Sequence, residues 1–263
     1  MTPCLLLIDP PQVGAWNMAV DEALLADADE RGAAAVRFYR WSEPTLSLGY
    51  FQAAADRQLH PPSRDLPMVR RQSGGGALVH DRELTYSIAL PATHPFARRP
   101  PSLYRLVHDA LRDALAAQGV TVRTVGCCAE SCGEPQSGGD AGTVEPFLCF
   151  ERRHPIDLVV ASAGDAAASS KVVGSAQRRR RGALLQHGSV LLERSPAAPE
   201  LPGLAEARGR AIDHEEIVRN VAATVLAALE LVVQRSALSD PLRQTAARLQ
   251  ASKYESAQWQ QRR

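Results

Sequence analysis

The sequence predicts an α/β (α+β) fold in which mixed sheets are flanked by helices. Two observations support this class: short apolar runs typical of strands alternate with amphipathic helices, and no internal repeat interrupts that alternation. The chain has 263 residues, of which 45% are hydrophobic, so it can bury one large core without disulfides. We therefore expect a single domain over residues 1–263.

Helical periodicity predicts four helices. Their ends carry familiar signals: Gly32 and Gly119 follow the first two, Ser102 caps the second, acids open the third, and Pro241 stands in the first turn of the fourth. The expected helices are Trp16–Arg31, Ser102–Gln118, Asp213 to about Val233, and one that begins at Asp240.

Nine apolar runs predict strands. A turn at Glu43-Pro44 separates the first two expected strands, and the three glycines at 74–76 separate the third from the fourth. Residues 126–146 and 195–210 have no hydrophobic period and are expected to be a long loop and a connector, while 162–170 joins the seventh and eighth strands. The expected strands are Val36–Trp41, Thr45–Tyr50, Pro67–Arg71, Ala77–His80, Glu83–Leu90, Val120–Val125, Ile156–Ala161, Lys171–Ala176 and Ala183–Leu192.

Composition excludes several classes of protein. The chain carries 30 basic and 29 acidic side chains, which argues against a general nucleic-acid binder. No apolar run approaches the roughly 18–20 residues of a membrane span, and the short run Cys4–Ile8 has no basic segment before it, so it is not expected to be a signal peptide. Five cysteines, an odd number, favour reduced thiols in a cytoplasmic protein.

The segment Arg70-Arg71-Gln72-Ser73-Gly74-Gly75-Gly76 is the first candidate for chemistry. Consecutive glycines weaken a sheet unless bare backbone is needed, and they let N–H groups approach an anion or a carbonyl oxygen. The two arginines add positive charge suited to a phosphate or a developing oxyanion. A flexible hairpin with solvated arginines would have the same spacing, so both interpretations stay open.

Three further segments hold candidate side chains. Lys171 opens Lys171-Val172-Val173-Gly174-Ser175-Ala176-Gln177, but a lysine at a strand start is usually solvated. His187, before Gly188 and Ser189, is more often a satisfied core histidine than a catalyst. Cys149 lies between Leu148 and Phe150, as a buried hydrophobe would, yet it ends the long loop and precedes a strand, where a nucleophile can be presented.

Cys127, Cys128 and Cys132 lie in the long loop and could suggest a metal site. A structural zinc site usually has four ligands, and the fourth would have to come from Cys149 or a distant histidine. We therefore expect no metal here.

Taken together, these segments resemble the lipoate-protein ligase and octanoyltransferase family, the lipoyl branch of the biotin/lipoyl protein ligase superfamily. The motifs occur in the family's order and span nearly the whole chain, although Ser73 stands where threonine is more common. The residues that carry the resemblance are Asn17–Leu24, Tyr39–Trp41 with Pro44, Ser47, Gly49 and Gln52, Arg70–Gly76 with His80-Asp81, Lys171–Gln177, His187–Ser189, and Lys253-Tyr254 with Trp259.

The resemblance implies the fold of the biotin/lipoyl ligase catalytic domain and leaves a choice between two chemistries. Ligases activate lipoate with ATP and usually carry an additional C-terminal domain, whereas one transferase branch uses a cysteine. Cys149-Phe150-Glu151 resembles the cysteine motif of that branch, and the chain ends soon after Trp259, so we expect no accessory domain. The resemblance therefore favours the cysteine-dependent octanoyltransferases.

This branch implies transfer of octanoate from acyl carrier protein to a lysine of a lipoyl-accepting protein, such as glycine cleavage H protein or a 2-oxoacid dehydrogenase E2, without a cofactor. Cys149 is the expected nucleophile, with Lys171 close enough to favour its thiolate and orient the acyl carbonyl. His80 is expected in the acyl pocket or in proton transfer. The residues expected to bind substrate are Arg70, Arg71, Ser73, Gly74, Gly75, Gly76, His80, Gly174, Ser175, Ala176, His187 and Gly188.

Three alternatives remain open at this point. An ATP-dependent lipoate ligase would use Lys171 to bind an acyl-adenylate and would not need Cys149. An amidotransferase would move octanoate between lipoyl domains. A non-catalytic module would only hold lipoyl domains or carrier protein, and the presence of both Cys149 and Lys171 weighs against it.

Overall fold

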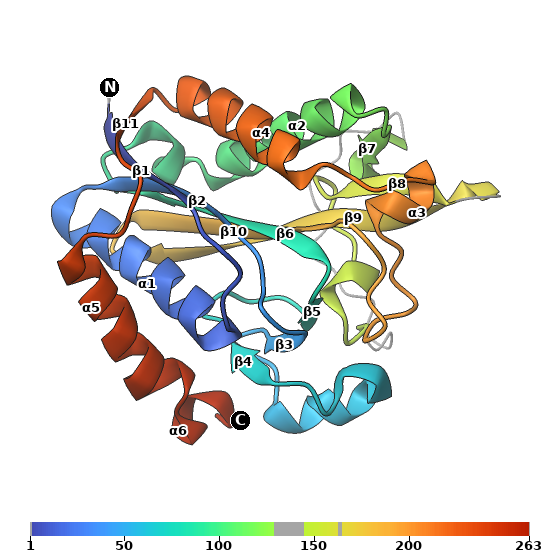
Figure 1. Cartoon of the computed structure of the whole chain (residues 1–263), viewed down its shortest axis with the longest axis horizontal. Coiled ribbons are helices and arrows are strands. Elements are labelled where there is room, and N and C mark those ends of the chain that lie inside the picture. The colour runs from blue at the N-terminus through green and yellow to red at the C-terminus, as the bar shows by residue number, and fades with distance from the viewer. Residues whose placement is uncertain (1, 129–144, 163–164, 263) are drawn as a thin grey trace.

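The computed structural model describes residues 2–128, 145–162 and 165–262. A large mixed sheet crosses the molecule, and a smaller sheet lies beside one end of it (Figure 1). In spatial order the large sheet contains β11 (Leu231–Arg235), β1 (Thr2–Ile8), β2 (Ala34–Tyr39), β6 (Glu83–Leu90), β10 (Ala183–Leu191), β9 (Asp165–Arg180), β8 (Leu158–Ser162) and β7 (Val122–Thr124). The small sheet contains β4 (Met68–Arg70), β3 (Thr45–Leu48) and β5 (Leu78–His80).

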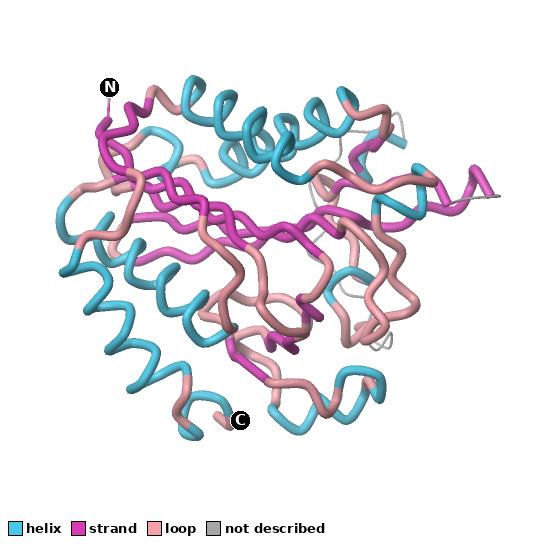
Figure 2. The backbone as a smooth tube through the Cα atoms, viewed as in Figure 1, coloured by secondary structure: helices cyan, strands magenta, loops and turns pink. Residues whose placement is uncertain are grey.

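Helices cover both faces of the large sheet, which forms a central band of strands between them (Figure 2). On one face lie α1 (Gly14–Arg31) and α5 (Asp240–Leu249), and on the other α2 (Pro100–Ala117) and α4 (His214–Ala228). Each face buries its own apolar cluster, so the sheet is hydrophobic on both sides. Two short helices, α3 (Leu204–Arg208) and α6 (Ala257–Gln260), complete the described α-helices, none of which is long and apolar enough to cross a membrane.

Strand pairing places the predicted motifs next to one another. In the large sheet, β10 is antiparallel to both β6 and β9, which sets Gly188 opposite Ser175 and His187 opposite Ala176. In the small sheet, β3 runs parallel to β4 and antiparallel to β5. The Arg70–Gly76 segment begins at the end of β4, and its Ser73 hydroxyl reaches His187 of β10 in the large sheet.

Three predicted helix boundaries were wrong by two residues or more. The first helix begins at Gly14 rather than Trp16. The helix expected to reach Val233 ends at Ala228, because Glu230 takes a left-handed conformation (φ 51°) and the chain turns into β11, which pairs with β1. The second helix begins at Pro100 rather than Ser102. Proline fits this first turn because its missing N–H would have no helical partner there.

Other parts of the secondary structure were missed. Strand β1 pairs with β2 and β11 and was not predicted, and α3 lies inside the expected connector 195–210. Most of the stretch 162–170, expected as a connection, belongs to the long strand β9, which pairs with β8. The fold class itself, mixed sheets flanked by helices, is confirmed.

Candidate active site

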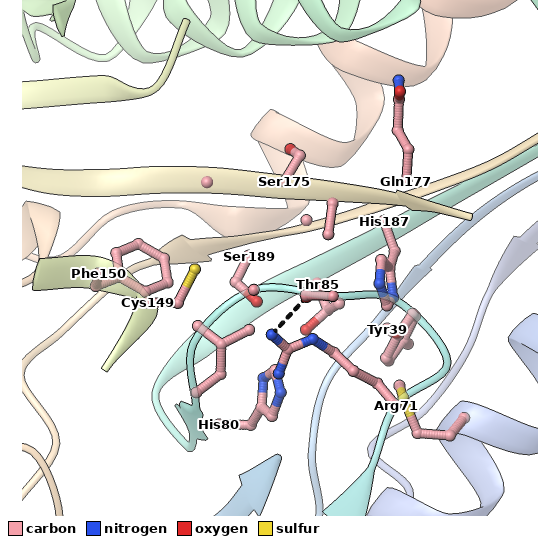
Figure 3. Close-up of a pocket in the computed structure, with 17 residues that line it drawn as sticks. Tyr39, Arg71, His80, Thr85, Cys149, Phe150, Ser175, Gln177, His187 and Ser189 are labelled. Carbon is pink, nitrogen blue, oxygen red and sulfur yellow. Dashed lines mark hydrogen bonds between the residues drawn. The ribbon is translucent and has the colours of Figure 1, made fainter. Parts of the chain in front are cut away.

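A cavity of about 290 Å³ lies where the glycine segment faces β9 and β10. Cys149 and Phe150 stand at one end of it, and Tyr39 and His187 stand at the other (Figure 3). Nine of the expected substrate-binding residues line it, and three, Arg70, Ser73 and Gly76, do not. The nine are Arg71, Gly74, Gly75, His80, Gly174, Ser175, Ala176, His187 and Gly188.

The glycine segment is in close contact with its neighbours. A Cβ on Gly49 would lie 2.1 Å from the backbone oxygen of Gly75, whose own φ of +95° disfavours any side chain. The segment is joined to the cysteine by backbone hydrogen bonds: Cys149 N donates to Ala77 O at 2.7 Å, and Ala77 N donates to Phe147 O at 2.9 Å. The glycines therefore let two loops approach closely and present one sulfur atom between them.

Cys149 begins a 3₁₀ turn, Cys149–Glu151, and is partly exposed. Its Sγ lies 3.7 Å from the point where a Cβ on Gly75 would stand, so the sulfur is next to the bare backbone of this glycine. Cys4 in β1 offers a contrast. It is 3% exposed, and burial raises the pKa of its thiol to about 12, which makes it a poor nucleophile.

Lys171 reaches the loop that carries Cys149. Its Nζ donates to the carbonyl oxygens of Cys149 at 3.2 Å and Arg152 at 3.3 Å, and it forms an ion pair with Asp157 Oδ2 at 2.7 Å. Both side chains of that pair are almost fully buried. The carboxylate of Asp157 thus largely neutralises the ammonium charge of Lys171. The hydrogen bond from Lys171 to Cys149 is made to the backbone carbonyl of that residue.

Sequence reasoning missed the residues that fix this lysine. Asp157 also accepts from Tyr104 OH at 2.9 Å and from the backbone N of His154 at 2.8 Å. A signal was present, because an acid directly before the apolar run of β8 must find a partner once it is buried. That the partner is Lys171 depends on the pairing of β8 with β9.

Arg71 supplies positive charge without a carboxylate partner among the described residues. Its guanidinium donates to Ser47 O at 2.9 Å, Gly74 O at 2.9 Å and Gly76 O at 2.5 Å, and no described carboxylate lies within ion-pair distance. Burial lowers the pKa of this guanidinium to about 10, against the opposing influence of Cys149. Arg71 Nη2 and Cys149 Sγ both lie within 4 Å of the point where a Cβ on Gly75 would stand, so the cation and the sulfur flank the same glycine.

Arg70, next in the chain, has a different role. Its side chain donates to the backbone oxygens of Gly49, Gln52, Trp259 and Gln260. It therefore ties the C-terminal segment to the loop after β3 and is placed outside the cavity.

Two histidines line the cavity, each held by a buried carboxylate. His80 stacks on Trp41 with 3.8 Å between ring centroids, and its Nδ1 bonds Glu83 Oε1 at 2.7 Å, while Nε2 has no partner among the described residues. His187 Nε2 bonds Ser73 Oγ at 2.5 Å, and its Nδ1 lies 3.5 Å from Asp21. Asp21 belongs to the Asn17–Leu24 motif that carries the family resemblance, whereas Glu83 was not singled out from the sequence.

Within the described residues, no three histidine, cysteine or carboxylate side chains gather as metal ligands would. Cys132 and the side chains of Cys127 and Cys128 lie outside the described residues, so the metal alternative considered for them is not addressed by the structure.

Comparison with known proteins assigns the chain to a family. Residues 14–224 match the lipoyl protein ligase A/B catalytic domain. Two curated relatives named octanoyltransferase LipM, from Brevibacillus brevis and Oceanobacillus iheyensis, are each 37% identical over 68% and 71% of this chain. The matched region spans 62% and 63% of those relatives, less than two thirds of their length.

The fold resembles that of a solved bipartite lipoate protein ligase from Thermoplasma acidophilum, with a TM-score of 0.71 at 17% identity over 99% of this chain and 97% of that one. That similarity supports the fold alone, while the family match spans most of the chain. The family expected from the sequence motifs is therefore confirmed, and the protein belongs to the lipoyl protein ligase A/B catalytic domain family.

Proposed function

We propose that this protein is an octanoyltransferase of lipoate biosynthesis that moves octanoate from acyl carrier protein to a lysine of a lipoyl-accepting protein through an acyl-enzyme on Cys149. The observation that carries the proposal is the position of Cys149: its partly exposed thiol stands at one end of a mainly apolar cavity, beside glycines and the guanidinium of Arg71. Relatives named octanoyltransferase support the same reaction class.

The proposed reaction has two steps. Cys149 Sγ attacks the thioester carbonyl, an S–C bond forms to the enzyme, and the carrier's thiolate leaves and takes up a proton. Exchange between two thioesters is nearly balanced, because a thiolate is both a good nucleophile and a good leaving group. The acceptor amine then attacks the acyl-enzyme, loses a proton and gives an amide, while Cys149 is released. Because an amide is more stable than a thioester, the reaction needs neither ATP nor a cofactor.

The side chains around the sulfur would have different roles in the reaction. Arg71 lies beside Gly75, and no carboxylate in the described part of the chain pairs with it, so its charge favours the thiolate of Cys149 and a developing oxyanion. Lys171, already paired with Asp157, would act chiefly by holding the Cys149 carbonyl and hence the turn that presents the sulfur. The octanoyl chain would extend along the cavity towards Tyr39 and His187.

The nearest rival is an ATP-dependent lipoate ligase, which would not need Cys149. We would assay octanoyl carrier protein with a lipoyl domain against lipoate, ATP and Mg²⁺ with the same domain. The proposal predicts turnover with the first set, loss of that turnover in Cys149→Ala, and its retention in Cys4→Ala. Cys4 is the matched control because it is a second described free cysteine and is buried away from the cavity. Full activity of Cys149→Ala with lipoate and ATP would reject the transferase.

The identity of the acyl donor separates two further possibilities. If an octanoylated lipoyl domain replaces carrier protein as the better donor, the enzyme is an amidotransferase between lipoyl domains. If no donor is used but lipoyl domains still bind, the protein is a binding module. The proposed donor and acceptors belong to cytoplasmic metabolism, so a cytoplasmic location is part of the proposal.

A further inference from the structure

A positively charged surface that includes aromatic rings lies beside the glycine segment. It surrounds a cavity of about 430 Å³ between the end of β9, the loop after β3 and the C-terminal segment. Figure 1 shows α6 of that segment beside β4, and Trp259 of α6 donates from Nε1 to Arg70 O at 2.8 Å. We call this the basic surface; it consists of Arg178, Arg179, Lys253 and Arg262 with the rings of Tyr50, Phe51 and Trp259. Within it, Lys253 is already paired with Glu22 at 2.6 Å.

Three arginines of the basic surface have no carboxylate partner in the part of the chain that the structure describes. The guanidinium carbons of Arg178 and Arg262 lie 5.5 and 4.5 Å from the ring centroid of Tyr50. Arg179 is exposed and forms no ion pair with any described residue. Arg180, next on β9, offers a contrast, because it pairs with two carboxylates at 3.0 and 2.7 Å. The basic surface therefore carries positive charge that the described residues do not balance.

The basic surface borders the cavity that holds Cys149. A Cβ on Gly74 would lie 3.8 Å from the ring of Phe51, which is 63% exposed, and Gly74 lines the cavity of about 290 Å³. Gln72 lines the cavity of the basic surface instead, and its buried side-chain nitrogen has no hydrogen-bond partner among the described residues. A protein bound to the basic surface would therefore lie beside the glycine segment and next to an unsatisfied donor.

We propose that the basic surface docks an acidic face of the acceptor protein, which then directs its lysine towards the octanoyl group on Cys149. The inference rests on the proposed function, because it assumes an acyl-enzyme and a protein acceptor. Arginine, tyrosine, tryptophan and phenylalanine are residue types that protein interfaces favour, and guanidinium groups bind carboxylates through paired hydrogen bonds. Unbalanced positive charge also attracts an acidic partner from a distance and speeds its association.

The reach of each partner favours the acceptor over the donor. The amine of a lysine stands on a flexible stem of only about four carbons, so its domain must dock close to the cavity that holds the acyl group. A carrier protein presents the octanoyl group on a pantetheine arm, which is much longer than a lysine side chain, so its body can bind farther away. The basic surface adjoins the glycine segment at Gly74 and therefore suits the partner with the shorter reach.

Separate measurement of the two half-reactions tests the inference. In the first, octanoyl carrier protein forms the adduct on the enzyme; in the second, the isolated octanoyl-enzyme reacts with a lipoyl domain. In the double variant Arg178→Glu with Arg179→Glu, we expect the second-order rate constant of transfer to the lipoyl domain to fall roughly tenfold or more at low ionic strength. Adduct formation should keep its wild-type rate. Added salt should narrow the difference in transfer, because it screens exposed charges.

Matched controls separate docking from damage to the site. Arg179→Glu alone should slow transfer less than the double variant does, whereas Arg219→Glu makes the same charge change on α4, on the opposite face of the large sheet, and should leave both half-reactions unchanged. Arg178→Lys with Arg179→Lys keeps the charge and should keep most of the transfer rate. A small amine such as ethanolamine needs no docking and should attack the octanoyl-enzyme of the double variant at the wild-type rate.

The outcomes that contradict the inference differ from those that contradict the proposed function. Equal transfer to the lipoyl domain by the double variant and the wild type, or an equal loss with ethanolamine, would overturn the inference while leaving the acyl-enzyme intact. Slower adduct formation with unchanged transfer would assign the basic surface to the donor and would also overturn it. Absence of any octanoyl adduct on the wild type would instead reject the proposed function. The mass of the intact protein therefore separates the two failures.

Discussion

Two buried ion pairs, one packed against α1 and the other against α2, perform different tasks. Arg37 of β2 binds Asp21 at 2.9 Å and Asp9 at 2.7 Å, and its remaining donors reach two oxygens of Asn17. Lys171 of β9 binds Asp157, but its remaining donors reach carbonyls of the turn that holds Cys149. The first pair therefore joins a helix to a strand, and the second joins a strand to the candidate nucleophile.

The largest expected effect is a loss of folding stability when the ion pair beside α1 is broken. Arg37→Met would leave Asp21 and Asp9 without their cation, and breaking a buried pair in this way typically costs about 3–5 kcal/mol in the free energy of unfolding. Urea denaturation measures that loss. Arg219→Met, on the surface, should change stability by less than about 0.5 kcal/mol. A cost below about 1 kcal/mol for Arg37→Met would contradict the structural role given to this pair.

The pair beside α2 should behave differently when both partners are replaced. Asp157→Leu alone leaves the buried Lys171 ammonium unpaired and is expected to cost about 3 kcal/mol. The double change Lys171→Met with Asp157→Leu removes both charges and should recover most of that stability, because apolar residues often replace a buried pair without loss. Octanoyl transfer should stay low in the double variant. Recovery of transfer together with stability would mean that the pair serves the fold alone.

The two regions should also lose stability in different pH windows. Burial lowers the pKa of His108, on α2, to about 4, although its bond to Ile156 O opposes the shift. The folded state then disfavours the imidazolium, so stability is complete above pH 6.5 and falls by up to ~3 kcal/mol as the pH drops from 6.5 to 4. Denaturation across this range measures the slope, and His108→Gln should flatten it.

Beside α1 the pH window is lower. Burial disfavours the charged form of Asp21, but the hydrogen bond to His187 and the charge of Arg37 outweigh it and hold the pKa of this carboxyl below its usual value of 3.8. That contribution is present above pH 3.8 and is lost as the pH falls further through the lowered pKa. A stability loss that persists between pH 6.5 and 4 in His108→Gln would contradict this assignment of the two windows.

The smallest expected effect is a decrease in the rate of octanoyl transfer when Gly174 is replaced. A Cβ at this position would lie 2.5 Å from Cε and 2.9 Å from Nζ of Lys171, so Gly174→Ala should push the ammonium away from the Cys149 carbonyl. We expect kcat/KM for transfer to fall roughly tenfold, equivalent to ~1.4 kcal/mol, because a flexible side chain can move aside. Thermal unfolding should change little. Unaltered kinetics would argue that the position of Lys171 does not matter for transfer.

The sequence was sufficient for features that depend on local pattern. The long helices followed from apolar periodicity. Residue type and spacing marked the glycine segment, Cys149 and Lys171 only as candidates, and the roles predicted for Cys149 and Lys171 came from the resemblance to the family. The partners Asp157 and Glu83 were missed, because their roles arise from contacts between segments far apart in the chain. The same reason accounts for β1 and β11, which pair with each other across almost the entire chain.

The central claim is that one sulfur atom carries the octanoyl group during turnover. Incubation with octanoyl carrier protein in the absence of acceptor, followed by intact-protein mass spectrometry, tests it most directly. We predict a single hydroxylamine-labile octanoyl adduct on the wild type and on Cys4→Ala, and none on Cys149→Ala. An adduct that survives Cys149→Ala, or octanoyl transfer by a wild-type enzyme that never acquires the adduct, would contradict the account.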